Sequence, residues 1–379
     1  MNWSYWEKTA FIGKPDVVII GSGIVGLSTA IELKTAQPSL RVMILERGVL
    51  PYGASTRNAG FACYGSMSEL MEDLEKHPHK DVFALVERRW KGLVRLRKRL
   101  GDNNLKYEPF GGYEVFTAED KNLFESCLSN VDDFNKTLES ITGLQNVYQN
   151  ATDKISSFGL GNVQHMIENS GEGQIDTGSM MQSLIAFAKN LNIEILNGIQ
   201  VSSIKTENNS VKILSDNCDT IEAHRVIITT NGFAKQFLPS YEVEPARAQV
   251  LVTEAITGLQ LKGSFHYDHG YYYFRNIGNR ILFGGARNLD FEAENTTDFS
   301  MTDKIQNRLD ELLHKMIAPG KNPKVEMRWS GIMGIGPKKS PIVQKVSDRI
   351  FCAVRMGGMG VALGSLVGED AAKLVMADL

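Results

Sequence analysis

The sequence has few cysteines and no excess of charge of either sign. Its four cysteines, Cys63, Cys127, Cys218 and Cys352, lie far apart and form no CxxC pair. We therefore expect neither a disulfide framework nor a zinc or other metal site. With 41 Lys and Arg residues against 44 Asp and Glu residues, the net charge is −3. Such a chain has no general attraction for a phosphate backbone, so we expect no nucleic acid partner.

Long hydrophobic runs are also missing. No stretch reaches the roughly 18 apolar residues that a membrane-spanning helix needs, and the first eight residues lack the basic segment and apolar run of a secretion signal. We expect a cytoplasmic protein without integral membrane contact. Its 379 residues, 42% of them hydrophobic, predict a globular protein of two domains, or of one large domain with insertions.

Glycine is more frequent than usual, and its excess is local. The chain has 35 glycines, about 9% against a typical value of about 7%. Residues 21–65 contain seven of them and residues 331–368 contain eight. The rest of the chain has an ordinary glycine content, so the excess belongs to two segments near opposite ends of the sequence.

The first of these segments begins with the pattern of a dinucleotide-binding turn. A β-branched run at residues 16–20 leads into Gly-Ser-Gly-Ile-Val-Gly at residues 21–26. A helix-like segment at residues 27–33 and a second strand at residues 41–46 follow. This order of strand, turn, helix and strand predicts a βαβ unit of the Rossmann type.

Each glycine of such a turn, and the acidic residue that follows it, has a physical role. Gly21 permits the sharp turn, Gly23 lets a pyrophosphate approach the helix N-terminus, and Gly26 allows close packing of helix on strand. Glu46 ends the second strand, 20 residues after Gly26, where its carboxylate can accept hydrogen bonds from ribose hydroxyls. The alternative interpretation is a plain glycine-rich turn beside a solvent-facing glutamate.

The later pattern favours FAD over a nicotinamide cofactor. The α/β pattern stops after residue 46 and returns only at residues 182–232, as expected of a flavin domain that another domain interrupts. A second glycine cluster at residues 53–60 could present backbone N–H groups to a pyrophosphate, a ribityl chain or a flavin ring; the alternative is a long surface loop.

The remaining segments complete a two-domain prediction. Periodicity predicts a helix at residues 81–100, a strand within residues 107–116, a hairpin at residues 271–283 with its turn at 276–279, and a helix at residues 303–316. A strand at residues 349–354 leads into a glycine loop that opens a terminal helix. We predict an α/β fold: a Rossmann-type FAD-binding domain (residues 1–103, 163–235 and 327–379) interleaved with an antiparallel-sheet, α+β substrate domain (residues 104–162 and 236–326).

The order of these motifs resembles that of FAD-dependent enzymes of the D-amino-acid oxidase superfamily, which includes glycine oxidase, sarcosine oxidase and gamma-glutamylputrescine oxidase. The resemblance covers nearly the whole chain and is carried by residues 16–46, 53–60, 173–177, 271–287, 329–331 and 357–360. It is strongest for the gamma-glutamylputrescine oxidase-like branch, because of Arg57-Asn58-Ala59-Gly60 and the tyrosine-rich strand that ends at Arg275.

The resemblance implies non-covalent FAD and a set of residues that bind it. The expected cofactor residues are Gly21, Gly23, Ile24, Val25, Gly26, Glu46 and Arg47; Ala54, Ser55, Asn58, Ala59 and Gly60; Val201, Thr229, Thr230 and Gly232; and Gly331, Gly357, Gly358, Met359, Gly360 and Val361. The last five would place a helix N-terminus against the flavin, where its partial positive charge would stabilise the anionic reduced form and raise the reduction potential.

The resemblance also assigns a substrate side, with one departure. Tyr271 and Arg287 match positions that face the flavin, although cross-strand packing is an alternative role for Tyr271. Where glycine oxidase-like members carry an arginine for the substrate carboxylate, this chain has Met333. An unpaired carboxylate in a dry pocket is costly, so we expect an amine, or an amino acid held by another cation such as Arg287, Arg275 or Lys339.

The expected function is oxidation of a C–N bond, with hydride passing to flavin N5 and the imine product hydrolysed. The partners would be a small amine or amino acid and either oxygen or another electron acceptor; the sequence leaves oxidase and dehydrogenase open. Two alternatives remain: a flavin dehydrogenase of a hydroxy acid or polyol phosphate that reduces a quinone, and a flavin-binding protein without turnover. In the first, the basic run at residues 88–99 would dock on a membrane surface, although a solvated helix face is the expectation we favour.

Overall fold

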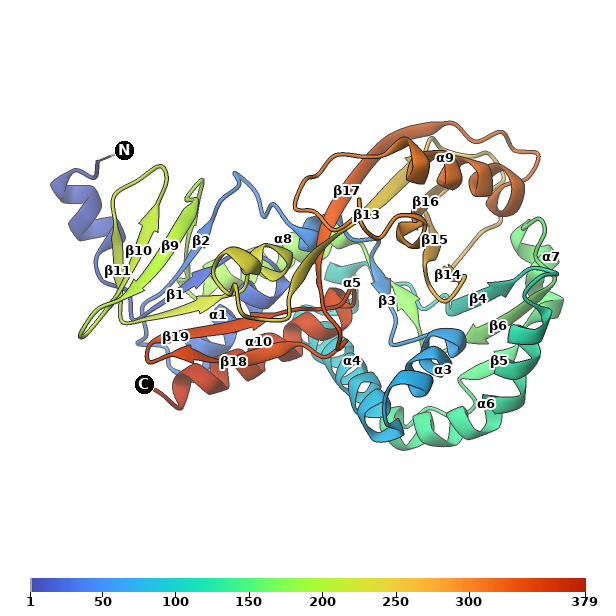
Figure 1. The fold of residues 1–379 in the computed structure, drawn as a ribbon, viewed down its shortest axis with the longest axis horizontal. Helices are drawn as coiled ribbons and strands as arrows, with labels where there is room; N and C mark the ends of the chain where they lie inside the picture. The colour runs from blue at the N-terminus through green and yellow to red at the C-terminus, as the bar shows by residue number, and fades with distance from the viewer. Residues whose placement is uncertain (1) are drawn as a thin grey trace.

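One lobe of the molecule is built on a six-stranded, mainly parallel sheet. In the computed structural model, which describes residues 2–379, its strand order is β18-β19-β12-β1-β2-β8, and this lobe lies on the left in Figure 1. Only β18 runs antiparallel to its neighbour. The strands are β1 (Val17–Ile20), β2 (Val42–Glu46), β8 (Glu194–Asn197), β12 (Arg225–Ile228), β18 (Ile342–Ser347) and β19 (Ile350–Val354). Every residue of β1, β2 and β19 is buried, as apolar runs predict for a sheet covered on both faces.

Three helices pack closely beside this sheet. They are α1 (Ile24–Ala36), α4 (His79–Leu100) and α10 (Gly360–Met376). Small residues set the approach of α4 to α10: a side chain at Gly92 would lie 1.9 Å from the carbonyl oxygen of Ala362, and the Ser365 hydroxyl donates to the carbonyl of Gly92 (2.6 Å). The long helix predicted at residues 81–100 is therefore present as α4. It contacts α1 near the start of the sequence and α10 near its end.

The second lobe contains an eight-stranded sheet in the order β17-β13-β16-β15-β14-β4-β6-β5, on the right in Figure 1. All neighbouring strands are antiparallel except β14 and β4, which are parallel. The strands are β4 (Gly112–Phe116), β5 (Tyr148–Asn150), β6 (His165–Asn169), β13 (Glu244–Thr253), β14 (Ser264–Tyr267), β15 (Tyr272–Ile277), β16 (Arg280–Gly285) and β17 (Val325–Ile335). The long strands β13 and β17 extend from this sheet toward the first lobe (Figure 1).

Shorter elements complete the fold. The further helices are α2 (Ala54–Arg57), α3 (Met67–Lys76), α5 (Asp102–Leu105), α6 (Lys121–Thr142), α7 (Ile155–Phe158), α8 (Thr177–Asn190) and α9 (Asp303–Leu312), with 3-10 or π turns η1 (Glu7–Ile12), η2 (Thr152–Lys154), η3 (Asn231–Gln236), η4 (Arg287–Leu289) and η5 (Leu313–Ile317). Two small sheets contain β9 (Val201–Thr206), β10 (Val211–Ser215) and β11 (Ile221–Ala223), and β3 (Phe61–Ala62) with β7 (Gly173–Gln174). Within residues 2–379, no helix combines the length and apolar character needed to cross a membrane.

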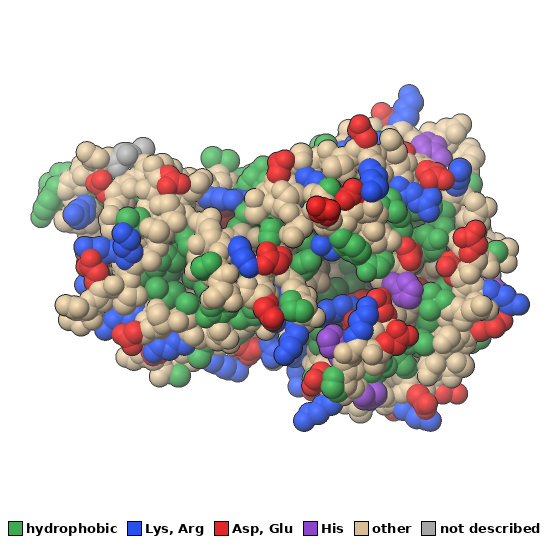
Figure 2. All heavy atoms as spheres, viewed as in Figure 1, with side chains coloured by type: hydrophobic (Ala, Val, Ile, Leu, Met, Phe, Trp, Pro, Cys, Tyr) green, Lys and Arg blue, Asp and Glu red, His purple; other side chains and the backbone are tan. Residues whose placement is uncertain are grey.

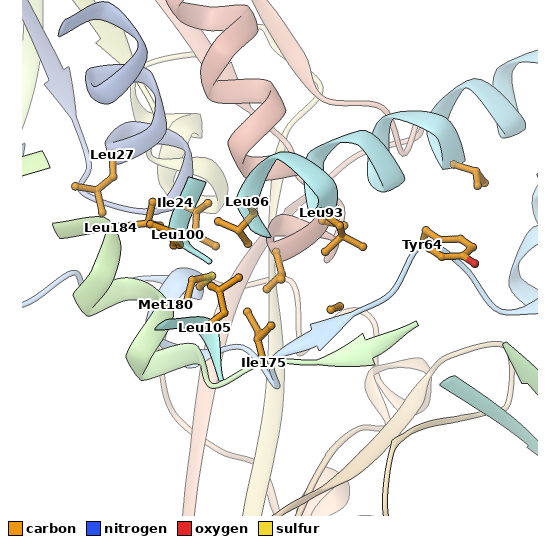
Figure 3. Packing of buried hydrophobic residues seen from close by; sticks show 14 of the residues in the cluster. Ile24, Leu27, Tyr64, Leu93, Leu96, Leu100, Leu105, Ile175, Met180 and Leu184 are labelled. Atoms are coloured by element: carbon orange, nitrogen blue, oxygen red, sulfur yellow. The ribbon is translucent and has the colours of Figure 1, made fainter. Parts of the chain in front are cut away.

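The largest core lies where α1, α4 and α8 meet. Figure 3 shows leucines of α4 pointing toward side chains of α5 and α8, and the residues that it labels are Ile24, Leu27, Tyr64, Leu93, Leu96, Leu100, Leu105, Ile175, Met180 and Leu184. All ten are at most 6% exposed. This core fixes the position of α1, and with it the turn that precedes α1.

The structure differs from the sequence expectations at three places. The hairpin turn contains only Gly278 and Asn279, because Ile277 pairs with Arg280. The strands β6 and β17 belong to the eight-stranded sheet, whereas the predicted domain ranges assign residues 163–169 and 327–335 to the cofactor domain. Those domain ranges stay a prediction.

The basic residues of α4 form a solvated face only in part: Lys91 and Lys98 are exposed, but three arginines are paired with acidic residues of neighbouring helices. Arg95 pairs with Glu32 of α1 and Glu369 of α10, and Arg99 also pairs with Glu32. Arg88 pairs with Asp370. These ion pairs join α4 to its two neighbouring helices, and the partners are too distant in sequence for a local pattern to reveal them.

Candidate active site

A cavity of about 670 Å³ lies between the two lobes. Its wall is formed by the turn after β1, the loop that contains α2, the loop before α10 and one face of the eight-stranded sheet. Figure 2 shows charged side chains of both signs, together with histidines, beside the junction of the two lobes. Segments from both ends of the sequence therefore share one wall.

The glycine positions of the turn between β1 and α1 have no room for side chains. Gly21 has a φ of 103°, in the region that favours glycine. A side chain at Gly26 would lie 2.0 Å from the carbonyl oxygen of Gly21, and one at Gly23 would lie 2.8 Å from the hydroxyl of Ser55. The backbone N–H of Ile24, the first residue of α1, points at that same hydroxyl (3.0 Å). The turn is therefore a cradle of the kind that a pyrophosphate fills at a helix N-terminus.

Glu46 lies at the end of β2, where the motif predicts it, and is 5% exposed. One carboxylate oxygen accepts from the backbone N–H (3.0 Å) and hydroxyl (2.7 Å) of Ser22, and the other from the N–H groups of Gly48 (3.0 Å) and Tyr52 (3.3 Å). Four donors of the protein thus orient the carboxylate toward the cavity. A ribose hydroxyl would take the place of the rotatable Ser22 hydroxyl at the Glu46 carboxylate, or both hydroxyls would donate to the same carboxylate oxygen.

The loop with the second glycine cluster is held by Asn58. Its side-chain oxygen accepts from the N–H of Gly60 (2.9 Å) and the hydroxyl of Thr177 (2.8 Å), and its amide donates to the carbonyl of Ser55 (2.9 Å). Gly60 has a φ of 74°. The cluster is therefore a fixed part of the cavity wall rather than a free surface loop.

A second helix N-terminus reaches the cavity at the far end of the sequence. Gly357 and Gly358 have positive φ angles of 58° and 84°, and α10 begins two residues later. Its N-cap residue, Met359, makes no side-chain cap hydrogen bond. The N-termini of α1 and α10 thus both present backbone donors and partial positive charge to one cavity.

The structure brings most of the expected cofactor residues together. All line the cavity except Gly26 and Gly232. Gly232 instead allows close packing, because a side chain there would lie 2.4 Å from the carbonyl oxygen of Met333. The Thr229 hydroxyl donates to the carbonyl of Ile20 (2.8 Å) and so braces the turn. The buried hydroxyl of Thr230 has no hydrogen-bond partner among the described residues, as expected of a group that binds a ligand.

The three expected substrate residues, Tyr271, Arg287 and Met333, line the other end of this cavity. Tyr271 precedes β15 and Arg287 follows β16, so the hairpin brings them together. Met333 is on β17, with its sulfur 3.4 Å from the position that a side chain on Gly358 would occupy. The two glycine-rich segments and the hairpin therefore meet around one space.

Of the three cations considered for a substrate carboxylate, Arg275 and Arg287 have no side-chain partner among the described residues, and of these two only Arg287 lines the cavity. Lys339 is paired with Glu69 (3.2 Å) and Asp73 (2.7 Å). Arg275 is 5% exposed and lies behind Gly60, where a side chain would come within 3.0 Å of its guanidinium. Arg287 lines the cavity, its side chain makes no hydrogen bond or ion pair with residues 2–379, and its Nε is buried without a partner.

Two further groups at this end were not found from the sequence. Glu69 of α3 pairs with the buried Arg89 (3.3 Å) as well as with Lys339. Burial alone would raise the pKa of Glu69, but these two cations lower it to about 2. His266 of β14 lines the cavity, and burial lowers its pKa to about 4 despite the nearby Glu69, so its ring is neutral at pH 7. A period-two pattern that puts Ser264 and His266 on one face could have indicated the histidine; no local signal marks Glu69.

Comparison with known proteins identifies the family to which this architecture belongs. A family model described as FAD dependent oxidoreductase (DAO) matches residues 16–374. The chain belongs to this family. Membership confirms the resemblance drawn from the motifs and the expectation of FAD as the cofactor.

Relatives and solved structures of similar fold agree with this assignment. The chain is 22% identical over 366 residues to the bifunctional protein ThiO/ThiG of Synechocystis, covering 95% of this chain but about half (51%) of that protein. L-proline dehydrogenase from P. horikoshii superposes with a TM-score of 0.76 at 19% identity, covering 96% of this chain and 94% of that one. Glycine oxidase from Geobacillus kaustophilus gives 0.75 at 20% identity, covering 96% and 95%. These similarities confirm the predicted fold class.

Proposed function

We propose that the protein binds FAD non-covalently and, in the cytoplasm, oxidises a C–N bond of a small amine or amino acid. Bound FAD would supply the electron sink that accepts a hydride from the substrate carbon. The imine left by the substrate would then be hydrolysed by water. One observation carries the proposal: a single cavity joins the dinucleotide turn at Gly21–Gly26 to the Tyr271 and Arg287 pair.

The free guanidinium of Arg287 supports a substrate with a carboxylate. A cation without a partner in a partly buried wall costs free energy, and a substrate carboxylate would offset that cost through charge-assisted hydrogen bonds. Tyr271 and Arg287 both contact the ring of Phe291, and the Tyr271 hydroxyl would add a third donor. Arg287 and Tyr271 would take the role of the arginine that glycine oxidase-like members carry at the position of Met333.

Part of the remaining wall favours an uncharged amine at the reacting end, beside the carboxylates of Glu69 and Asp73, which are paired with Lys339. Phe61, Met333 and the neutral His266 all line the cavity. An ammonium group has no lone pair and is disfavoured where water is excluded. These side chains would therefore promote the neutral amine, whose lone pair assists departure of the hydride from the adjacent carbon.

The pairing of the α4 basic residues argues against the quinone-docking alternative. Arg88, Arg95 and Arg99 are engaged with acidic residues of α1 and α10, so they would not form a free positive surface for a membrane. Oxygen or another soluble electron acceptor remains the proposed partner of the reduced flavin.

A substrate panel tests the proposal directly. The purified protein is expected to be yellow, and under anaerobic conditions an amine or amino acid should bleach its visible absorbance. An Arg287→Met variant should lose at least tenfold in kcat/KM for carboxylate-bearing substrates, about the effect of removing one charge-assisted hydrogen bond, but little for simple amines. Bleaching by hydroxy acids alone, or by no compound of these classes, would reject the proposal. Peroxide formation in air identifies oxygen as the acceptor.

A further inference from the structure

A segment without helix or strand, residues 290–302, connects η4 to α9 and packs against residues that line the cavity. We call this segment the strap. Its middle is fixed to the eight-stranded sheet by a buried ion pair between Glu294 and Arg247, which are 1% and 3% exposed. Arg247 donates through Nε (2.9 Å) and a terminal nitrogen (2.7 Å) to the two carboxylate oxygens of Glu294. Such a two-pronged buried contact gives the strap a defined position.

The strap has a second attachment near its end. Arg247 also donates to the hydroxyl of Ser300 (2.6 Å). Gln249 exchanges hydrogen bonds with Thr302, whose N–H donates to the Gln249 side-chain oxygen (3.1 Å). The strap is therefore held at two points on β13, and an aromatic side chain lies beside each: Phe291 before the first and Phe299 before the second.

Phe291 contacts the substrate end of the cavity. Its ring is 5.9 Å from that of Tyr271 in an edge-to-face arrangement, and the guanidinium carbon of Arg287 lies 4.8 Å from its centre. The guanidinium of Arg287 makes no hydrogen bond with the described residues, so stacking on Phe291 is the contact that orients it.

Phe299 contacts the cofactor end. Its ring lies 4.8 Å from that of Tyr52 and 5.9 Å from that of Phe233, and the guanidinium carbon of Arg57 is 4.6 Å from its centre. Tyr52, Phe233 and Arg57 all line the cavity on the side of the dinucleotide turn. Phe299 thus covers this part of the wall from outside and joins the strap to the first lobe.

Hydrogen bonds from side chains to backbone carbonyls keep Phe299 and its neighbours in place. The Ser330 hydroxyl donates to the carbonyl of Phe299 (2.6 Å). Arg57 donates to the carbonyl of Ser330 (2.8 Å), and the indole N–H of Trp329 donates to the carbonyl of Arg57 (3.0 Å). The strap, β17 and the loop of α2 therefore form one connected cover across the two lobes.

We propose that the strap is a clasp with two ends. Phe291 positions Arg287 and Tyr271 for a carboxylate, and Phe299 closes the cavity over the ADP half of FAD. The first part rests on the proposed function, while the second requires only that the chain binds FAD. Phe291 acts through Arg287 and is a positioning residue. Phe299 acts through Tyr52, Phe233 and Arg57 and sets how quickly FAD escapes.

The test compares two alanine variants of the FAD-loaded protein with two readouts. Release of FAD is followed by the rise in flavin fluorescence after dilution, without substrate. Carboxylate binding is followed by titrating acetate, with acetamide as the uncharged control, and recording the flavin absorbance. Phe299→Ala should release FAD about tenfold faster, because a cover of cation–π and ring contacts is lost, and should bind acetate as the wild type does.

Phe291→Ala should show the opposite result. Its affinity for acetate should fall about fivefold, approaching that for acetamide, while FAD release stays at the wild-type rate. Phe291→Tyr and Phe299→Tyr keep the rings and should restore each property. If an alanine variant is poorly folded by thermal unfolding, Phe291→Leu or Phe299→Leu takes its place.

The outcomes separate the clasp from the proposed function. Equal effects of both variants on both readouts, or no effect on either, would overturn the clasp. A protein that shows the expected pattern with FAD and acetate, yet oxidises no amine or amino acid, would retain the clasp and reject only the proposed function.

Discussion

At the level of single residues, the cofactor end of the cavity depends on glycines placed where a side chain would fill the space of the ligand. Gly23 is one such residue: its φ of −71° is ordinary, so its identity reflects space rather than backbone strain. Gly53, nearby on the same wall, has open space around it. Substitutions at these two glycines therefore distinguish a loss of space for the ligand from a general effect of altering the cavity wall.

Gly23→Val is expected to give a folded but colourless protein. The branched side chain would displace the Ser55 hydroxyl and occupy the approach to the N-terminus of α1. The ratio of flavin absorbance to protein absorbance measures the loss. Gly53→Ala is the matched control and should keep its FAD; full flavin absorbance in Gly23→Val would refute the assigned cofactor site.

Tyr271→Phe is expected to lower kcat/KM about tenfold without changing the FAD content. It removes a hydroxyl beside Arg287 but keeps the ring contact with Phe291, and one hydrogen bond to a charged group has about this effect. Steady-state kinetics on the substrate identified by the panel measures it. Tyr272→Phe is the control, because that ring is 3% exposed in the core and does not line the cavity. An unchanged rate in Tyr271→Phe would favour a packing role.

At this scale the sequence predicted what short spacings encode. The turn at residues 21–26 is recognisable because neighbouring residues define it, whereas Tyr271 and Arg287 were expected from the family resemblance and their roles stay a prediction. Glu69 and His266 were missed, because their roles depend on Arg89, Lys339 and burial in a cavity that no local pattern describes.

At the level of elements, the crossing of α4 and α10 holds the long helix α4 against the cofactor lobe. Gly92 approaches the start of α10 so closely that the helices meet through backbone atoms, and ion pairs from Arg88 and Arg95 reinforce the contact. The helix itself was predictable from its apolar spacing. Its acidic partners were not, since they lie on separate helices.

Gly92→Ala is expected to destabilise the protein by about 1–3 kcal/mol, the usual cost of overpacking. The added carbon would lie 1.9 Å from the carbonyl oxygen of Ala362, so α10 must shift. Thermal or denaturant unfolding measures the change, and Val94→Ala, 43% exposed on the same helix, should have little effect. Because α10 begins at the cavity, Gly92→Ala should also weaken FAD binding; equal stability of the two variants would contradict the predicted contact.

At the level of the whole molecule, a buried carboxyl makes stability depend on pH. Glu172 is 2% exposed, and burial raises its pKa to about 8 although the N–H groups of Tyr64 and Gly65 donate to it. The unfolded chain loses this proton near the ordinary value of about 4.3. Between these values the folded state binds more protons than the unfolded state, so this group lowers stability as pH rises from about 5 to 8.

Glu172→Gln should therefore flatten this part of the stability profile. Its amide oxygen can still accept from both backbone groups, but no charge has to be buried at high pH. The variant is expected to gain about 1 kcal/mol or more over the wild type at pH 8, and less at pH 5. Unfolding at several pH values tests this, with the exposed Glu125→Gln as the control; a constant difference across pH would contradict the raised pKa.

The sheet order of the whole molecule was predictable only in part. The glycine excess correctly pointed to two segments near opposite ends of the sequence, which line one cavity. The place of β17 was not predictable, because the strand pairs with β13 along the substrate sheet while its end contributes Met333 to the cavity. Pairing between distant strands is decided by packing rather than by local sequence.

The shared wall also fixes when the cofactor can be acquired. The first cofactor turn, at residues 21–26, leaves the ribosome early, but residues 357–361 and α10 emerge only after nearly all of the described chain has been synthesised. A nascent chain therefore lacks half of the cradle. FAD loading is therefore expected only once residues 357–361 and α10 have left the ribosome, and in a translation reaction chains that stop before residue 357 should show no bound flavin.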